Sequence, residues 1–262
     1  MIKSALKFRS IIFYLIQACF SYHVGAAELL MLTDDGPPHM IATSNSGIDV
    51  DITREILEQM GHTVKINYAP LSRNMIQVAN QQADLFLPTF FQHDTDKLFI
   101  SSPIINYRPT IFSLISSDFD FNSIADLAGK NLVTFQGASG YFGDEFIKVS
   151  KLNGYSELHD MSKFPEMLIK ARCEVVVLDY YIFYYYLQKY LQQNPDESGV
   201  IKEIEEFILI PTVKAHVGFN NKILRDMFNQ HLAIYKRQYK DKAVINKYIP
   251  SVETSHQNLP EN

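Results

Sequence analysis

Gly47-Ile48-Asp49-Val50-Asp51 opens the segment of the sequence that decides the fold. After it, apolar side chains recur at the spacing of one buried helix face, at Ile52, Ile56, Leu57 and Met60. We expect Asp49 or Asp51 to cap this helix, because a carboxylate there can accept hydrogen bonds from the free amides. Gly61 follows the last apolar position, where a left-handed residue ends a helix without a Cβ clash.

The rest of the segment alternates strands and helices. A strand over 64–68, a helix over 72–81 and an apolar strand over 85–87 follow the first helix. Such alternation predicts a parallel sheet with crossover helices. Ligands of these sheets bind at the carboxyl ends of the strands, so we expect residues 70–73 and 88–90 on one rim.

The composition indicates a globular protein of one large or two small domains. The chain has 262 residues, of which 47% are hydrophobic and 20% are charged, and its net charge is -5. A disordered chain would hold fewer apolar residues. No basic stretch follows the first ten residues. Nucleic acid is therefore not expected as a partner, because phosphate binding needs a concentrated positive face.

The N-terminus has the order of a secretory signal peptide. Three basic residues precede an apolar run over 11–20, and small residues follow it. The run is too short to span a bilayer, which takes about 20 apolar residues. We expect a signal peptide over 1–27, cleaved after Ala26 or Ala27, and hence a periplasmic protein. A faint lipoprotein motif at Cys19 leaves lipid anchoring as an alternative.

A second α/β series follows a polar break at 116–123. In it, a strand runs into the loop 136–140 and then into a helix. The β-branched run at 174–178 is typical of a buried strand. Asp179 stands at its end, where it can also cap the next helix, 180–193. That helix holds six tyrosines, which indicate packing, since each buries a large ring.

Several short motifs occur along the chain in an order typical of a known family. They are Gly47-Ile48-Asp49-Val50-Asp51, Arg73 followed by Ala83-Asp84, 99–104, 126–130, Gln136-Gly137-Ala138-Ser139 and Leu178-Asp179. Together they resemble the extracytoplasmic solute-binding proteins of polar amino acid uptake systems (family 3), the periplasmic components of ABC transporters. The resemblance covers nearly the whole chain after the signal.

This resemblance implies an α/β protein with the two-lobe, type II periplasmic-binding-protein fold. Each lobe would be a mostly parallel sheet flanked by helices, and two hinge strands would join the lobes. Lobe 1 would hold 28–112 and 211–262, and lobe 2 would hold 113–210. The linkers would lie near 110–114 and 209–212, and the lobes would close around a ligand by a hinge motion.

The resemblance also implies where a ligand would bind. Asp179 would take the ligand's α-ammonium through a charge-assisted hydrogen bond. Ser139, with the amides of Gly140 and Tyr141, would offer a helix start that favours an anion. Ordinary helix capping is the alternative interpretation for both positions. Phe90 and Leu71 would give the cleft apolar walls, with core packing as the alternative.

One departure from the family concerns the group that binds a carboxylate. The family usually has an arginine in the loop after Phe90, but this chain has no arginine in 92–97 and only Lys97, which lacks the planar fork. Arg73 can supply the charge from the same rim, and a salt bridge to Asp34, Asp35 or Asp84 is the alternative. The resulting ligand-binding set is Leu71, Arg73, Thr89, Phe90, Ser139, Gly140, Tyr141 and Asp179.

The sequence predicts no catalytic residue, no metal site and no cofactor. The histidines have no pair at the i, i+4 spacing of a helical metal site. Each of five is expected at the surface or satisfied in a loop: His39, His62, His93, His159 and His216. Cys173 is expected to be a buried small hydrophobe.

We therefore expect a monomeric periplasmic protein that captures a small polar ligand, an amino acid or a similar molecule, for an inner-membrane ABC permease. One alternative is a periplasmic enzyme on the same fold, similar to cyclohexadienyl dehydratases, with Asp179 or Glu174 as its acid. A second alternative is a ligand-sensing module for a membrane receptor.

Overall fold

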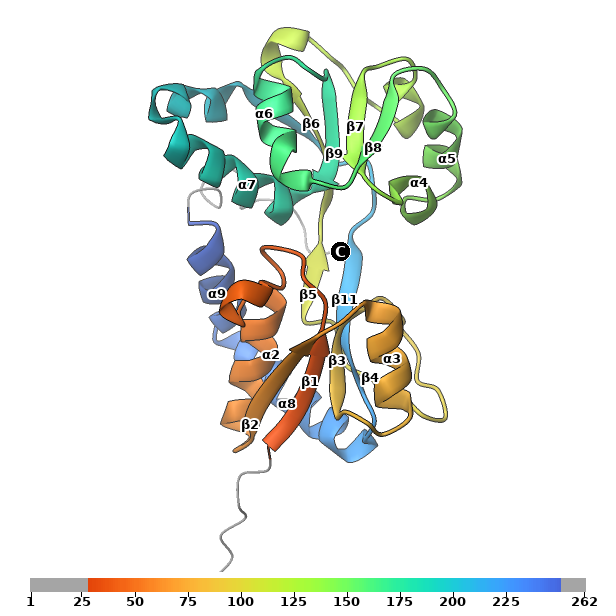
Figure 1. Ribbon diagram of the computed structural model, residues 1–262, viewed down its shortest axis with the longest axis vertical. Coiled ribbons are helices and arrows are strands. Elements are labelled where there is room, and N and C mark those ends of the chain that lie inside the picture. The colour runs from red at the N-terminus through yellow and green to blue at the C-terminus, as the bar shows by residue number, and fades with distance from the viewer. Residues whose placement is uncertain (1–27, 251–262) are drawn as a thin grey trace, which may run out of the picture.

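The computed structural model describes residues 28–250, which form two α/β lobes stacked end to end (Figure 1). Each lobe has its own sheet, with the strand order β2-β1-β3-β11-β4 in lobe 1 and β10-β6-β9-β7-β8 in lobe 2. The two-lobe α/β fold expected from the sequence is therefore confirmed. The signal peptide expected over 1–27, including Cys19, lies outside the described residues. Within 28–250, no helix has the length and apolar character needed to cross a membrane.

Lobe 1 is built on a mixed sheet whose first three strands are parallel. β1 pairs in parallel with β2 and β3, whereas β11 runs antiparallel to β3, β4 and β5. The strands are β1 (Glu28–Thr33), β2 (Thr63–Tyr68), β3 (Leu85–Thr89), β4 (Phe99–Ile100), β5 (Ile105–Tyr107) and β11 (Val213–Phe219). Every residue of β3 is buried, as expected of a strand with helices over both faces.

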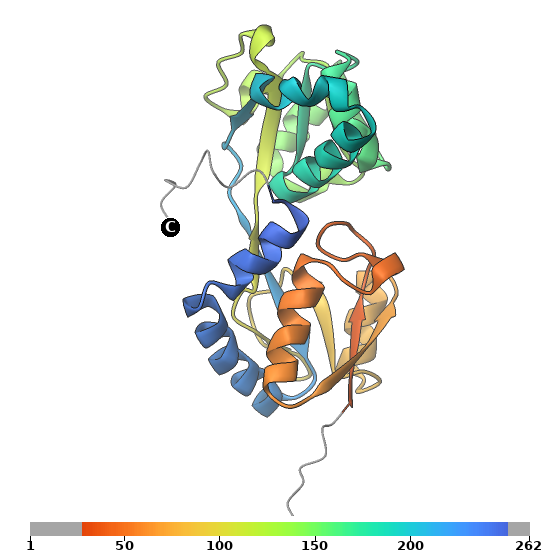
Figure 2. The same cartoon turned by 90° about the vertical axis from the view of Figure 1, so that its left-hand side faces the viewer.

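Helices cover both faces of the lobe 1 sheet. They are α2 (Ile48–Gln59), α3 (Leu71–Ala79), α8 (Lys222–Arg237) and α9 (Lys240–Tyr248). α2, α8 and α9 lie together on one side (Figure 2), and α3 packs on the other. Ile52 and Ile56 of α2 are fully buried, which confirms the helix face that the sequence predicts.

The start of α2 differs from the expectation that Asp49 or Asp51 would cap it. The helix begins at Ile48 with Gly47 at its N-cap, so both acids lie inside the first turn. A Cβ at Gly47 would come within 2.3 Å of the His39 carbonyl oxygen, and only glycine permits this approach. The Asp49 carboxylate is therefore available to side chains of the preceding loop. At the other end, Gly61 has a φ of +86°, as expected of a residue that ends a helix.

Lobe 2 has a sheet with a parallel centre and an antiparallel edge. β7 pairs in parallel with β8 and β9, β6 runs antiparallel to β9, and β10 runs antiparallel to β6. The strands are β6 (Pro109–Leu114), β7 (Leu132–Phe135), β8 (Tyr155–Leu158), β9 (Val175–Asp179) and β10 (Ile204–Phe207).

The helices of lobe 2 flank this sheet on both sides. The α-helices are α4 (Ala138–Tyr141), α5 (Asp144–Ser150), α6 (Phe164–Ile169) and α7 (Tyr180–Gln193). Short 3-10 helices in the two lobes are η1 (Ala42–Ser44), η2 (Ile115–Ser117), η3 (Ile124–Leu127), η4 (Met161–Lys163) and η5 (Pro195–Glu203). α7 has the bounds that the sequence predicts. Cys173 is buried, as expected, and burial raises the pKa of its thiol to about 12.

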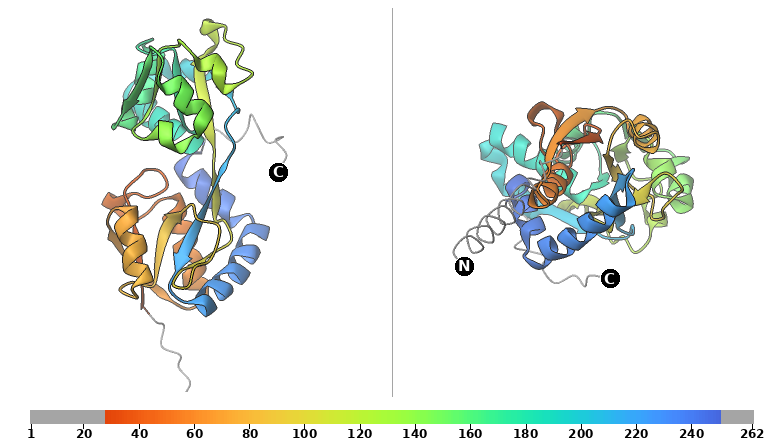
Figure 3. Two further views of the ribbon diagram at one scale, coloured as in Figure 1. Left: turned by 90° about the vertical axis from the view of Figure 1, so that its right-hand side faces the viewer. Right: turned by 90° about the horizontal axis from the view of Figure 1, so that it is seen from below.

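The chain crosses between the lobes twice. The first crossing is at Arg108, between β5 and β6, and the second spans 208–212, between β10 and β11. The two crossing segments run side by side (Figure 3). The linker expected near 110–114 is instead β6, because that strand pairs with β9 and β10 inside the lobe 2 sheet. The expected lobe boundary after residue 112 therefore falls within a strand of lobe 2.

The carboxyl ends of the parallel strands of both lobes face the junction (Figure 1). β1 and β3 end there from lobe 1, and β7 and β9 end there from lobe 2. One apolar cluster continues from the α2 side of lobe 1 to the α6 and α7 side of lobe 2, so the lobes are in contact along that side. The residues that follow these strand ends are the candidates for a functional site.

Candidate functional site

Asp179 lies at the carboxyl end of β9, and its carboxylate is buried. It caps α7 by accepting hydrogen bonds from the amides of Tyr181, at 2.9 Å, and Ile182, at 3.2 Å. Its second oxygen accepts from the Arg108 amide at 2.6 Å. The expected helix cap is confirmed, and Asp179 also anchors the first crossing between the lobes.

His39 links the two lobes through this carboxylate. It lies in the loop after β1, where its Nε2 is 3.2 Å from Oδ1 of Asp179. Its Nδ1 is 2.8 Å from Oδ1 of Asp49, in the first turn of α2. The imidazole is buried. Tyr107 stacks on it with 3.9 Å between ring centroids, and the Tyr107 hydroxyl donates to Oδ2 of Asp49 at 2.8 Å.

The His39 ring carries a positive charge at neutral pH. Burial alone would lower its pKa, but the Asp49 and Asp179 carboxylates raise it to about 9. Both ring nitrogens then donate, one to an acid of each lobe. His39 was expected at the surface or satisfied in a loop; it is a buried, satisfied loop residue, and no sequence pattern predicts this bridge. Burial and then the negative charge of Asp49 raise the pKa of Tyr107 well above its usual value, so its hydroxyl stays protonated and remains a donor.

Phe90 and Tyr141 form an aromatic contact between the lobes. Phe90 follows β3, Tyr141 ends α4, and their rings meet edge to face with 5.9 Å between centroids. Phe90 is 36% exposed and Tyr141 is 38% exposed. Phe90 also contacts the Tyr107 ring at 5.5 Å. Burial and then the Asp179 charge raise the pKa of Tyr141 to about 12, so its hydroxyl is a neutral donor at physiological pH.

Arg73 lies in the first turn of α3, on the rim of lobe 1. Its side chain is exposed, and no ion pair of its guanidinium is found among residues 28–250. The three acids expected as alternative partners accept hydrogen bonds from backbone amides instead. Asp34 accepts from the amide of Asp35, and Asp35 accepts from the amide of Ala42. Asp84 accepts from the amide of Leu30. Arg73 therefore offers a cation at the rim.

Two further residues of the expected set lie near these strand and helix ends. Leu71 is half-buried at the start of α3. Thr89, the last residue of β3, is buried, and its hydroxyl accepts from the Phe91 amide at 3.3 Å. Thr89 is therefore enclosed behind the rim, whereas Leu71 stays partly accessible.

The amides after β7 are bonded within the protein. Those of Gly140 and Tyr141 donate to the Gly137 carbonyl, and that of Ser139 donates to the Glu157 carboxylate at 2.9 Å. The Tyr155 hydroxyl and the Gly137 and Ser139 amides together lower the pKa of Glu157 to about 2. An anion was expected at this helix start, and a side-chain carboxylate of the protein occupies it.

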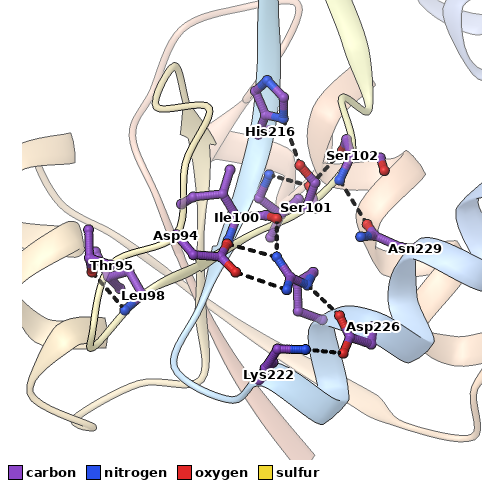
Figure 4. A network of polar contacts seen from close by, with 12 residues as sticks. Asp94, Thr95, Leu98, Ile100, Ser101, Ser102, His216, Lys222, Asp226 and Asn229 are labelled. Carbon is purple, nitrogen blue, oxygen red and sulfur yellow. Dashed lines mark hydrogen bonds and ion pairs between the residues drawn. The ribbon is translucent and has the colours of Figure 1, made fainter.

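The loop 92–97, in which the resemblance led us to look for an arginine, is fastened to α8 (Figure 4). Asp94 accepts two hydrogen bonds from Arg225, at 2.8 and 3.0 Å. Arg225 also donates to the Ile100 carbonyl at 2.6 Å. The fork of this arginine is thus used to hold the loop. His216, expected at the surface or in a loop, is instead buried in β11, where its Nδ1 donates to the Ser101 carbonyl at 2.7 Å.

The sequence predicts the acid and the two aromatic residues of this junction as ligand-binding but not the residues that contact them. His39 and Tyr107 are absent from that prediction, and Asp49 or Asp51 is predicted only to cap α2. A buried acid that does not cap its helix needs another donor, which is the signal that could have pointed to His39. Among residues 28–250, no group of three or more His, Cys, Asp or Glu side chains is arranged to hold a metal ion.

Neither a protein-family model nor a curated protein sequence matches this chain. Solved structures match it over most of its length. The GluR0 ligand-binding core in complex with L-glutamate is 15% identical, with a TM-score of 0.65 over 86% of this chain and 99% of its own. An ancestral cationic amino acid solute-binding protein is 15% identical, with a TM-score of 0.66 over 85% of this chain and 96% of its own.

A histidine kinase sensor domain with similarity to periplasmic binding proteins is also alike in structure. It is 16% identical, with a TM-score of 0.60 over 86% of this chain and 97% of its own. At such identities the likeness establishes the fold, which is the two-lobe fold of periplasmic solute-binding proteins.

Proposed function

We propose that this protein is an extracytoplasmic solute-binding protein of family 3 that captures a small polar ligand between its lobes. The fold supports this, because it is shared with an amino acid solute-binding protein and with the L-glutamate-binding core of GluR0. The order of the sequence motifs supports the same family. The signal peptide expected over 1–27 supports a periplasmic location. We propose that the protein is a monomer and that its partner is an ABC permease.

One observation carries the proposal: exposed groups of both lobes meet where the parallel strands end. Phe90 from lobe 1 contacts Tyr141 from lobe 2, and Arg73 lies on the same rim. The two crossings, at Arg108 and 208–212, are short segments about which the lobes can rotate. A ligand that packs against the Phe90 and Tyr141 rings would contact both lobes, and its binding would favour the closed arrangement.

Ligand-dependent stabilisation tests the proposal. The chain from Glu28 is heated with a panel of amino acids, dicarboxylates, small peptides and aromatic acids, each at millimolar concentration. A ligand at 100 times its Kd adds about 2.7 kcal/mol to the free energy of unfolding, which raises Tm by several degrees. The variants Phe90→Ala and Tyr141→Ala should lose the shift, and Leu152→Ala, an exposed residue of lobe 2, should keep it. No shift across the panel would refute the proposal.

A sensor role is the second candidate, and a specific observation favours it. A histidine kinase sensor domain shares the fold over 97% of its own length. The same ligand binding would then report to a membrane receptor rather than to a permease. Crosslinking of the exported protein in the cell, followed by identification of the captured membrane protein, separates the two roles.

The enzyme alternative has less support from the geometry. Asp179 is buried, and both its oxygens accept hydrogen bonds from the protein. Glu174 precedes β9 at the opposite end of the strand, roughly 16 Å along the chain from Asp179. Its carboxylate accepts from the Asn131 amide at 2.7 Å. Turnover of prephenate or arogenate that is lost in Asp179→Asn would restore this alternative.

A further inference from the structure

The Asp179 carboxylate is hydrogen-bonded to the protein at both oxygens and already has a cationic partner in His39. A carboxylate offers about four lone-pair sites. In this protein Oδ1 accepts from the amides of Tyr181 and Ile182 and from Nε2 of His39, and Oδ2 accepts from the amide of Arg108, which leaves one lone-pair site on Oδ2. The cationic partner of Asp179 therefore belongs to the protein itself.

His39 is held in this position by residues of both lobes. Asp49 accepts from its Nδ1, the Tyr107 ring stacks on its face, and Tyr181 of α7 contacts it edge to face at 5.8 Å. The imidazole is 1% exposed, and Asp49 is fully buried. A ligand amine could take the place of His39 at Asp179 only by displacing a charged ring from three neighbours, which would leave Asp49 buried without its cation.

The exposed groups of the junction favour a different ligand chemistry. The guanidinium of Arg73 is exposed and has no ion pair with any residue in 28–250, and it suits a carboxylate because its planar shape donates two parallel hydrogen bonds. Tyr141 presents a neutral hydroxyl, and its ring and that of Phe90 provide an apolar wall. The acids of the same rim, Asp34 and Asp35, each already accept a backbone amide hydrogen bond.

We propose that His39 is a specificity-determining residue that excludes ligands with a primary amine, so that the site takes small carboxylates without an amino group. This inference rests on the proposed function. His39 supplies from within the protein the positive charge that an amino acid would bring, and the ligand needs to supply only the anion and an apolar body. The discrimination acts against the amine, because a second cation would be repelled by the imidazolium that already neutralises Asp179.

Matched pairs that differ only in the amine test the inference. Binding to the chain from Glu28 is measured by calorimetry for 3-phenylpropanoate against L-phenylalanine, and for glutarate against L-glutamate. We expect the deaminated member of at least one pair to bind ten or more times more tightly. Equal or tighter binding of the amino acid would overturn the role of His39 while leaving the proposed function intact. Binding by no member of either pair, nor of the wider panel, would count against the proposed function instead.

Removal of the imidazole provides the second arm. In His39→Gly, imidazole added at millimolar concentration should raise Tm, because it refills the site between Asp49 and Asp179, and the preference against the amine should fall to less than threefold. His93→Gly, which removes an exposed histidine, should show neither effect. If His39→Gly does not fold, His39→Gln keeps the size and the polarity without the charge. A preference unchanged in the variant that folds would overturn the inference.

Discussion

Replacement of His39 by glutamine should remove a pH-dependent part of the protein's stability. The imidazole is buried between Asp49 and Asp179, and its pKa rises from 6.5 to about 9 in the folded protein. At about 1.4 kcal/mol per pKa unit, this rise corresponds to about 3 kcal/mol. Because the folded pKa is the higher one, the stabilisation is complete below pH 6.5 and is lost as the pH rises to about 9.

Urea unfolding between pH 6 and pH 10 measures this contribution. Other groups titrate in the same range, so the quantity compared is the difference between the wild type and His39→Gln at each pH. We expect the wild type to lose about 3 kcal/mol more than the variant over this range, or roughly 6 to 12 °C in Tm. A difference that stays constant from pH 6 to pH 10 would refute a charged His39.

Three further outcomes are expected from single substitutions elsewhere. Gly218→Ala should lower the free energy of unfolding, measured by urea titration, by about 1–3 kcal/mol, because the new Cβ would lie 2.2 Å from the Phe86 ring. The control Gly199→Ala should leave it nearly unchanged, because its Cβ would meet no atom within 4 Å. Asp51→Ala should lower the free energy of unfolding by about 2–3 kcal/mol, because the Asp51 carboxylate accepts from the Tyr248 hydroxyl, at 2.5 Å, and from Lys247 of α9. Hydrogen exchange of the α9 amides should become faster in this variant. Glu157→Gln should lower the free energy of unfolding by less than about 1 kcal/mol at pH 7, because solvent screens this carboxylate. The difference between the two proteins should vanish as the pH falls from 4.5 towards 2, which acid unfolding of both proteins measures.

The sequence predicts the elements of the fold because their signals are local. The apolar spacing in 47–60 and the β-branched run before Asp179 each follow from the period of one helix or one strand. The first crossing was placed in 110–114 instead of at Arg108, because an alternating strand looks the same in a hinge and in a sheet. The pairing of β6 with β9 and β10 that decides the matter is a long-range contact.

The candidate site could be predicted only where topology places a residue at a strand end. That rule placed Phe90 on the rim, and the resemblance to family 3 added Asp179. It could not locate His39, which is 140 residues from Asp179 in sequence and lies in a loop without periodicity. It also could not show that Glu157 fills the helix start at Ser139, because that contact depends on the register of β7 against β8.

The two crossings also determine the order in which the halves of the protein can be completed. Lobe 2 is one uninterrupted stretch of the chain, whereas β11 lies between β3 and β4 in the lobe 1 sheet and follows all of lobe 2 in sequence. The ribosome therefore synthesises every strand of lobe 2 before β11, the strand that completes the sheet of lobe 1. Until residues 213–219 have been synthesised, one edge of β3 has no partner strand, and the lobe 1 sheet can complete its native strand pairing only in the last quarter of translation.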